Sequence, residues 1–121
     1  MTKKKILLID DNSHVTQVLS HGLTAVGYET SAENDPTRAL QTALAFKPDL
    51  VLLDVDMPGM DGGDVMQELR SQREFRETPM IFLTSLATPQ DTAARDDASE
   101  TVLSKPITIV ELTRQIEMKL G

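Results

Sequence analysis

Carboxylates close two of the most apolar stretches of this 121-residue sequence. Asp10 and Asp11 directly follow the run ILLI, and Asp54 and Asp56 follow the run LVLL, with a Pro-Gly pair immediately after Met57. Burying an unpaired charge is very unfavourable, so a carboxylate at the end of an interior run needs a partner or a chemical role. A divalent cation with oxygen ligands would provide both, because it offsets the charge and can bind phosphate oxygens.

Two further polar groups follow apolar runs in the same way. Thr84 ends the stretch MIFLT, and Lys105 follows the stretch TVLS and precedes a proline. Phosphoryl chemistry uses a point charge and a hydrogen-bond donor aimed at the transferred group, and a lysine and a hydroxyl supply these parts. Carboxylates, a hydroxyl and a lysine at the ends of apolar runs therefore indicate phosphoryl chemistry assisted by magnesium.

The apolar runs have the composition of buried parallel strands. Ile6–Ile9, Leu50–Leu53 and Met80–Leu83 are apolar without alternation, as expected for strands covered on both faces. Residues 28–33 and 101–104 are weaker strand candidates. Apolar residues with helical spacing occupy the intervals, and the pairs Asp35-Pro36, Thr88-x-x-Asp91 and Thr108-x-x-Glu111 resemble helix starts.

The order of elements predicts five strands alternating with five helices. Such an order favours a parallel sheet with right-handed crossovers, and we expect a flavodoxin-like three-layer α/β sandwich with strand order 2-1-3-4-5. In that order the first and third strands flank the point where the strand order reverses. Asp11 and Asp54 would then be neighbours across it, and magnesium would relieve the crowding of three carboxylates with Asp10.

Composition narrows the class of protein. A chain of 121 residues with 40% hydrophobic residues suits one domain, residues 1–121. The absence of cysteine excludes disulfides and thiolate metal sites. A net charge of -7 disfavours direct binding to nucleic acid. No apolar run approaches the length of a membrane span, so we expect a soluble cytoplasmic protein with no membrane contact.

Four motifs in this order and spacing resemble the receiver domain of two-component response regulators: LLIDDN, LLDVDMPGMDG, IFLTS and LSKPI. The resemblance covers nearly the whole chain. It implies roles for six residues. Asp54 would be the phosphoacceptor, and Asp10 and Asp11 the acidic pair, with Asp11 as a direct magnesium ligand. Asp56 would bind magnesium through its main-chain carbonyl, Thr84 would supply the switch hydroxyl, and Lys105 would be the family lysine.

The same resemblance implies a function and partners. We expect a signalling switch that takes a phosphoryl group from a phosphohistidine on a histidine kinase or phosphotransfer protein, with Mg2+ as the cofactor. The expected domain is not an enzyme with its own substrate but a phosphoacceptor that promotes its own phosphorylation and dephosphorylation, and then acts on a downstream effector domain or protein. Leu86 and Val102 depart from the family pattern, which often has a water-orienting side chain and an aromatic ring there.

Two alternatives remain at this stage. Asp54-Val55-Asp56 also resembles the Asp-x-Asp motif of haloacid-dehalogenase-type phosphatases, although here it lies on the third strand and not the first, and only Glu111 and Glu117 follow Lys105 as acidic residues. A binding module with this fold that never takes phosphate is the other alternative. Sustained turnover of para-nitrophenyl phosphate would distinguish the phosphatase.

Overall fold

The sheet of this protein is parallel and has five strands in the order β2-β1-β3-β4-β5. The structure is a computed structural model that describes residues 3–55, 57, 62–84, 100–104 and 107–120. Its strands are β1 (Lys5–Ile9), β2 (Glu29–Glu33), β3 (Leu50–Asp54), β4 (Met80–Thr84) and β5 (Glu100–Ser104). Its α-helices are α1 (Ser13–Val26), α2 (Ala39–Phe46), α3 (Gly62–Arg70) and α5 (Ile109–Leu120). The strand order predicted from the sequence is confirmed.

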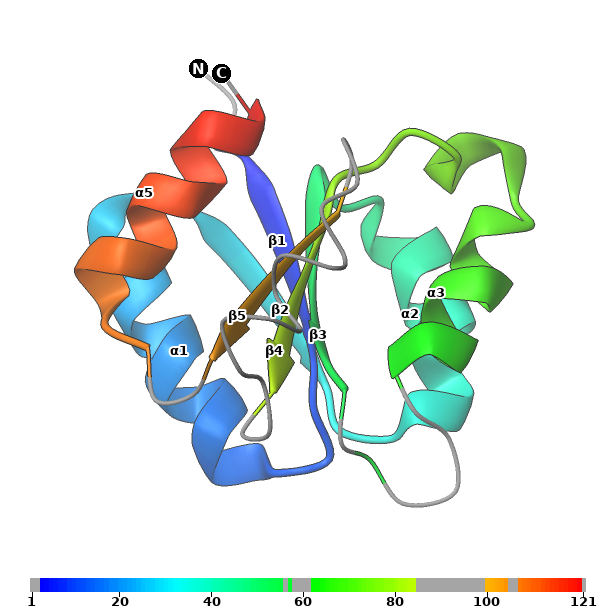
Figure 1. Cartoon of the computed structure of the whole chain (residues 1–121), viewed down its shortest axis with the longest axis horizontal. Helices are drawn as coiled ribbons and strands as arrows, with labels where there is room; N and C mark the ends of the chain where they lie inside the picture. The colour runs from blue at the N-terminus through cyan, green and yellow to red at the C-terminus, as the bar shows by residue number, and fades with distance from the viewer. Residues whose placement is uncertain (1–2, 56, 58–61, 85–99, 105–106, 121) are drawn as a thin grey trace.

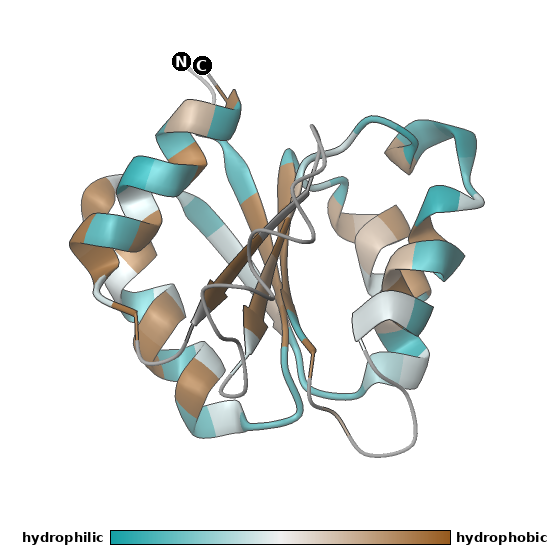
Figure 2. Ribbon diagram, viewed as in Figure 1, coloured by the Kyte–Doolittle hydropathy of each residue, from teal (hydrophilic) through white to brown (hydrophobic). Residues whose placement is uncertain are grey.

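The helices form a layer on each face of the sheet, with α1 and α5 on one face and α2 and α3 on the other (Figure 1). Alternate residues of the inner strands point to opposite faces, and because both faces are covered, residues 6–9 of β1, 50–53 of β3 and 80–83 of β4 are apolar without alternation (Figure 2). The layer of α2 and α3 packs on Leu7, Val51 and Phe82, whereas the layer of α1 and α5 packs on Ile6, Leu52 and Ile81. The predicted three-layer sandwich is therefore confirmed.

Local sequence signals set several helix ends. Asn12 caps α1, because its side chain accepts hydrogen bonds from His14 N and Val15 N at 3.0 and 3.3 Å. Gly27 ends the same helix with a φ of 121°, a conformation that favours glycine. At the start of α5, Thr108 accepts a hydrogen bond from Glu111 N at 3.1 Å, which is one of the two bonds of the predicted capping box, while the Glu111 carboxylate accepts from Arg114 and Gln115.

The structure refines the helix start predicted at Asp35-Pro36. Asp35 does cap a helical turn that begins with Pro36, but this turn is a short 3-10 helix, η1 (Pro36–Arg38), which leads into α2. A second 3-10 helix, η2 (Arg73–Phe75), lies between α3 and β4. Phe75 is buried there and joins the core.

The predicted helix between β4 and β5, with its capping box at Thr88 and Asp91, lies outside the described residues. Four α-helices are described, and the fifth would occupy this interval. Within the described ranges, no helix has both the length and the apolar composition needed to cross a bilayer.

Candidate functional site

Three carboxylates from two neighbouring strand ends converge at one edge of the sheet. Asp54 is the last residue of β3, and Asp10 and Asp11 follow β1 directly. Since β1 and β3 pair in parallel, with Ile9 opposite Leu53, their carboxyl ends coincide. One carboxylate oxygen from each of the three residues lies within 4.8 Å of the others.

The three carboxylates differ in their exposure. Asp10 and Asp54 are buried, at 4% and 3% exposed, whereas Asp11 is exposed. The main-chain N–H of Asn12 donates to Asp10 Oδ1 at 2.9 Å, so part of the Asp10 charge is already stabilised by the turn that begins α1. The site therefore has two carboxylates fixed in the protein and one at the solvent boundary.

The neighbouring strand β4 holds the end of β3 in place. Asp54 is paired in register with Leu83, and the N–H of Val55 donates to the Leu83 carbonyl at 2.9 Å. Thr84, the next residue of β4, is buried at 6% exposed. The structure thus places Thr84 at the same edge of the sheet as Asp54, as predicted.

Two predicted site residues, Asp56 and Lys105, lie outside the described residues, as do Pro106 and the Pro58-Gly59 pair. Strand β5 ends at Ser104, which is paired in register with Thr84. The roles of Asp56 and Lys105 remain predictions.

The donor set fits a hard divalent cation. Like charges this close repel each other, and a cation bound by oxygen ligands removes the repulsion. Magnesium holds its ligands at about 2.0–2.1 Å, so oxygens within 4.8 Å of one another need only a small movement to share one ion. Among the described residues this group contains three aspartates and no histidine or cysteine, and such a set of oxygen ligands favours Mg2+ over zinc.

Asn34 is a residue of this edge that the sequence did not single out. Asn34 follows β2, and its side-chain amide donates to the main-chain oxygen of Asp10 at 2.7 Å and to Thr16 Oγ1 at 3.0 Å. The signal for Asn34 is that it follows the second strand, just as the other polar residues of this edge follow their strands. Asn12 also belongs to the site through its N–H, which the sequence does not reveal because an asparagine before a helix indicates only a cap.

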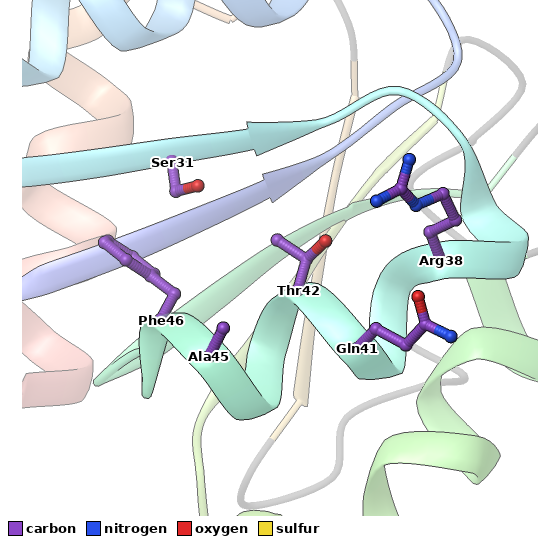
Figure 3. A pocket seen from close by; sticks show the side chains of 6 residues that line it. All are labelled: Ser31, Arg38, Gln41, Thr42, Ala45 and Phe46. Atoms are coloured by element: carbon purple, nitrogen blue, oxygen red, sulfur yellow. The ribbon is translucent and has the colours of Figure 1, made fainter.

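Surface hollows occur elsewhere on the protein. One of about 410 Å³ lies beside β2 and α2, where Ser31, Arg38, Thr42 and Phe46 are among its lining residues (Figure 3). Another of about 430 Å³ lies near the amino end of β3, beside Pro48 and Asp49. Neither is lined by the three convergent carboxylates, so neither forms part of the acidic site.

The carboxylates of this protein lie at the point where the strand order of its parallel sheet reverses. Open α/β proteins of this class bind their ligands at that point, beside the carboxyl ends of the strands. The family model for the response regulator receiver domain matches residues 6–117. This chain therefore belongs to the response regulator receiver domain family, whose members are phosphorylation-dependent switches of two-component signalling. The family match does not favour the phosphatase alternative.

Similar proteins carry this domain in several contexts. The transcriptional regulatory protein HprR of Escherichia coli K12 is 34% identical over 117 residues, which cover 96% of this chain and 51% of HprR. The polar-differentiation response regulator DivK of Brucella anthropi is 30% identical over 119 residues, covering 98% of this chain and 97% of DivK. This chain thus spans about half the length of HprR and nearly all of DivK.

A solved receiver domain has the same fold. It comes from the sensor histidine kinase PA1611 of Pseudomonas aeruginosa PAO1, and its structure contains a magnesium ion coordinated in the active-site cleft. The TM-score is 0.85 at 29% identity, and the alignment covers 99% of each chain.

Proposed function

We propose that residues 1–121 act as one receiver domain that accepts a phosphoryl group on Asp54. The observation that carries this proposal is the convergence of Asp10, Asp11 and Asp54 at the end of a rigid, buried strand. A nucleophile on a strand keeps its direction, which brings the attacking oxygen and the phosphorus into line. The donor is a phosphohistidine on a histidine kinase or phosphotransfer protein.

The transfer exchanges one bond to phosphorus for another. A carboxylate oxygen of Asp54 forms a bond to phosphorus, the bond between phosphorus and the histidine nitrogen breaks, and its electron pair returns to the imidazole ring. The product is an acyl phosphate. Hydrolysis by water restores the Asp54 carboxylate and releases inorganic phosphate, and we propose that the domain promotes this step as well.

Asp10, Asp11 and Asp54 would hold Mg2+ together with the main-chain carbonyl of Asp56. When bound, the ion offsets negative charge on the transferring phosphoryl oxygens. Asp10 and Asp11 bring the carboxylate oxygens, while the N–H of Asn12 keeps the Asp10 carboxylate directed. Lys105 would contribute a positive charge next to the phosphoryl group.

Thr84 would link phosphorylation of Asp54 to a change in the conformation of the protein surface. Its hydroxyl lies on the strand next to Asp54, and a phosphoryl group brings strong acceptors and additional negative charge. A hydrogen bond from Thr84 to a phosphoryl oxygen would shift the segment that follows β4. An effector domain or a separate effector protein would bind the shifted surface. We propose that the domain acts in the cytoplasm.

Phosphorylation by a small donor tests the proposal. The protein is incubated with Mg2+ and either acetyl phosphate or phosphoramidate, and its intact mass is measured. Wild type should gain one phosphate, and Asp54→Asn should gain none. Asp49→Asn is the matched control, because Asp49 precedes the same strand at its opposite end and should not affect the reaction. Absence of the mass gain in wild type with both donors would refute the proposal and favour a module that does not take phosphate.

A further inference from the structure

The end of β2 reaches across to the acidic site through one side chain. Asn34 Nδ2 donates to the main-chain oxygen of Asp10 at 2.7 Å, and the same nitrogen donates to Thr16 Oγ1 at 3.0 Å. A carbonyl oxygen only accepts hydrogen bonds, so the nitrogen of the amide must face Asp10. Both amide hydrogens therefore have acceptors, one on the β1–α1 loop and one on the first turn of α1.

Asp10 is held at three separate points. Its N–H donates to the Glu33 carbonyl at 3.2 Å, its carbonyl accepts from Asn34, and its carboxylate accepts from Asn12 N at 2.9 Å. Two of these three bonds come from the end of β2. The Asp10 carbonyl belongs to the peptide group that joins Asp10 to Asp11. The orientation of this peptide group therefore sets the direction in which the exposed Asp11 side chain points.

Thr16 makes the arrangement more rigid. Its side chain is buried at 1% exposed, and its hydroxyl donates to the Ser13 carbonyl at 3.0 Å while it accepts from Asn34. Asn34 thus links β1, β2 and α1 around one peptide group. A neutral amide achieves this without adding another negative charge beside the three carboxylates.

We infer that Asn34 is a positioning residue of the acidic site, which acts through the main-chain carbonyl of Asp10 to hold Asp10 and Asp11 in an orientation suited to Mg2+. The inference rests on the proposed function, because it takes these carboxylates as metal ligands. Residues that orient metal ligands without touching the ion change metal affinity by about 10-fold or more when they are removed. Asn34→Ala should therefore weaken Mg2+ binding by about 10-fold.

Thr42 provides the matched control. Its hydroxyl donates to the Glu33 carboxylate, so it also connects α2 to the end of β2, but its bond ends on a side chain and not on Asp10. Thr42→Val removes a hydrogen bond from the same segment with little change in shape. Its effect on Mg2+ affinity should be less than about twofold if only the bond to Asp10 matters.

Calorimetric titration with Mg2+ measures the dissociation constants of wild type, Asn34→Ala and Thr42→Val, well below the thermal midpoint of each protein. Phosphorylation by phosphoramidate is then compared at saturating Mg2+, where Asn34→Ala should recover most of the wild-type rate. This recovery separates weakened metal binding from a general loss of structure. Should Asn34→Ala not fold, Asn34→Ser replaces it, since a shorter side chain loses the double contact with less disturbance.

The outcomes are distinct. Weaker Mg2+ binding in Asn34→Ala alone supports the inference. Equal affinity in all three proteins, or equal weakening in both variants, overturns it and leaves the proposed function intact. Absence of Mg2+ binding by wild type overturns both.

Discussion

Gly62, the first residue of α3, lies directly against the main chain of Asp54. A Cβ at position 62 would be 2.8 Å from the Asp54 carbonyl oxygen, closer than a Cβ atom can approach without a shift of the backbone, and it would make a tight contact of 3.1 Å with Val55 Cα. The Gly62 N–H also donates to the Val55 carbonyl at 3.2 Å. Helix α3 therefore begins in contact with the proposed phosphoacceptor, and only glycine allows this approach.

Replacing Gly62 with alanine should disturb the acidic site. Because the added methyl group meets backbone, the end of β3 or the start of α3 must shift, and overpacking of this kind costs about 1–3 kcal/mol of the free energy of unfolding. Denaturant unfolding measures this loss. The rate of Asp54 phosphorylation by phosphoramidate should fall as well, since the nucleophile is displaced.

Gly22→Ala is the comparison for this variant. A Cβ at Gly22 would meet Ile109 Cδ1 at 2.5 Å, so the clash is with a side chain at the contact between α1 and α5. The Ile109 side chain can shift and alanine favours a helix, so stability should change less than in Gly62→Ala, and the phosphorylation rate should stay near that of wild type. A similar rate loss in both variants would mean that general destabilisation, not the contact with Asp54, limits the reaction.

Phosphorylation should be transmitted through Thr84 and not through a ring on β5. Val102 is buried at 4% exposed and is paired in register with Phe82, and valine is too short and too stiff about χ1 to fill or vacate an aromatic pocket. Thr84→Ala should therefore remove most of the amide chemical-shift changes that beryllofluoride causes after β4. Val102→Ala should keep most of them.

Amide spectra of wild type, Thr84→Ala and Val102→Ala, recorded with and without beryllofluoride, provide this comparison. Both variants remove side-chain atoms from buried strand positions, so each controls for loss of packing in the other. Loss of the response in Val102→Ala together with its retention in Thr84→Ala would disprove the route.

The phosphorylated form should hydrolyse slowly. The resemblance to receiver domains assigns a water-flanking position to Leu86, which lies outside the described residues, and a leucine cannot orient water by hydrogen bonding. Leu86→Glu should therefore shorten the lifetime of phospho-Asp54 several-fold, measured as the decay of the phosphorylated mass after donor removal. Leu86→Met is the control, because it changes the side chain without adding a hydrogen-bonding group. An equal or longer lifetime in Leu86→Glu would contradict the prediction.

Lowering the pH should destabilise η1, the 3-10 helix that Asp35 caps. The Thr37 hydroxyl and the Thr37 N–H both donate hydrogen bonds to the Asp35 carboxylate. These bonds, mainly the one from the hydroxyl, lower the pKa of the Asp35 carboxyl in the folded protein. A group whose pKa is lower in the folded state stabilises the fold above its unfolded pKa, about 3.9 for aspartate, and this contribution is lost as pH falls through the folded pKa. Carbon-detected NMR titration should give a pKa for Asp35 below that ordinary value, and Thr37→Val should raise it. An unchanged pKa in Thr37→Val would assign the shift to other neighbours.

The sequence determined the elements of this protein because their signals are local. Unbroken apolar runs identified β1, β3 and β4, and the spacing of apolar residues identified the helices between them. Asp35 and Thr108 indicated helix starts because a cap bonds to backbone two or three residues away. The order of alternating strands and helices then restricted the topology to a parallel sheet, since such crossovers have one preferred hand.

Tertiary structure decided how closely the site side chains approach and which other residues contact them. Asp10 and Asp54 are 44 residues apart, and no local pattern shows that their oxygens come within 4.8 Å; that distance follows from β1 and β3 being paired in register. The link from Asn34 to Asp10 and the contact of Gly62 with Asp54 arise in the same way, between segments that are adjacent only after the sheet has formed. Residue types therefore established the chemistry that this chain can carry out, whereas strand pairing established which residues act together.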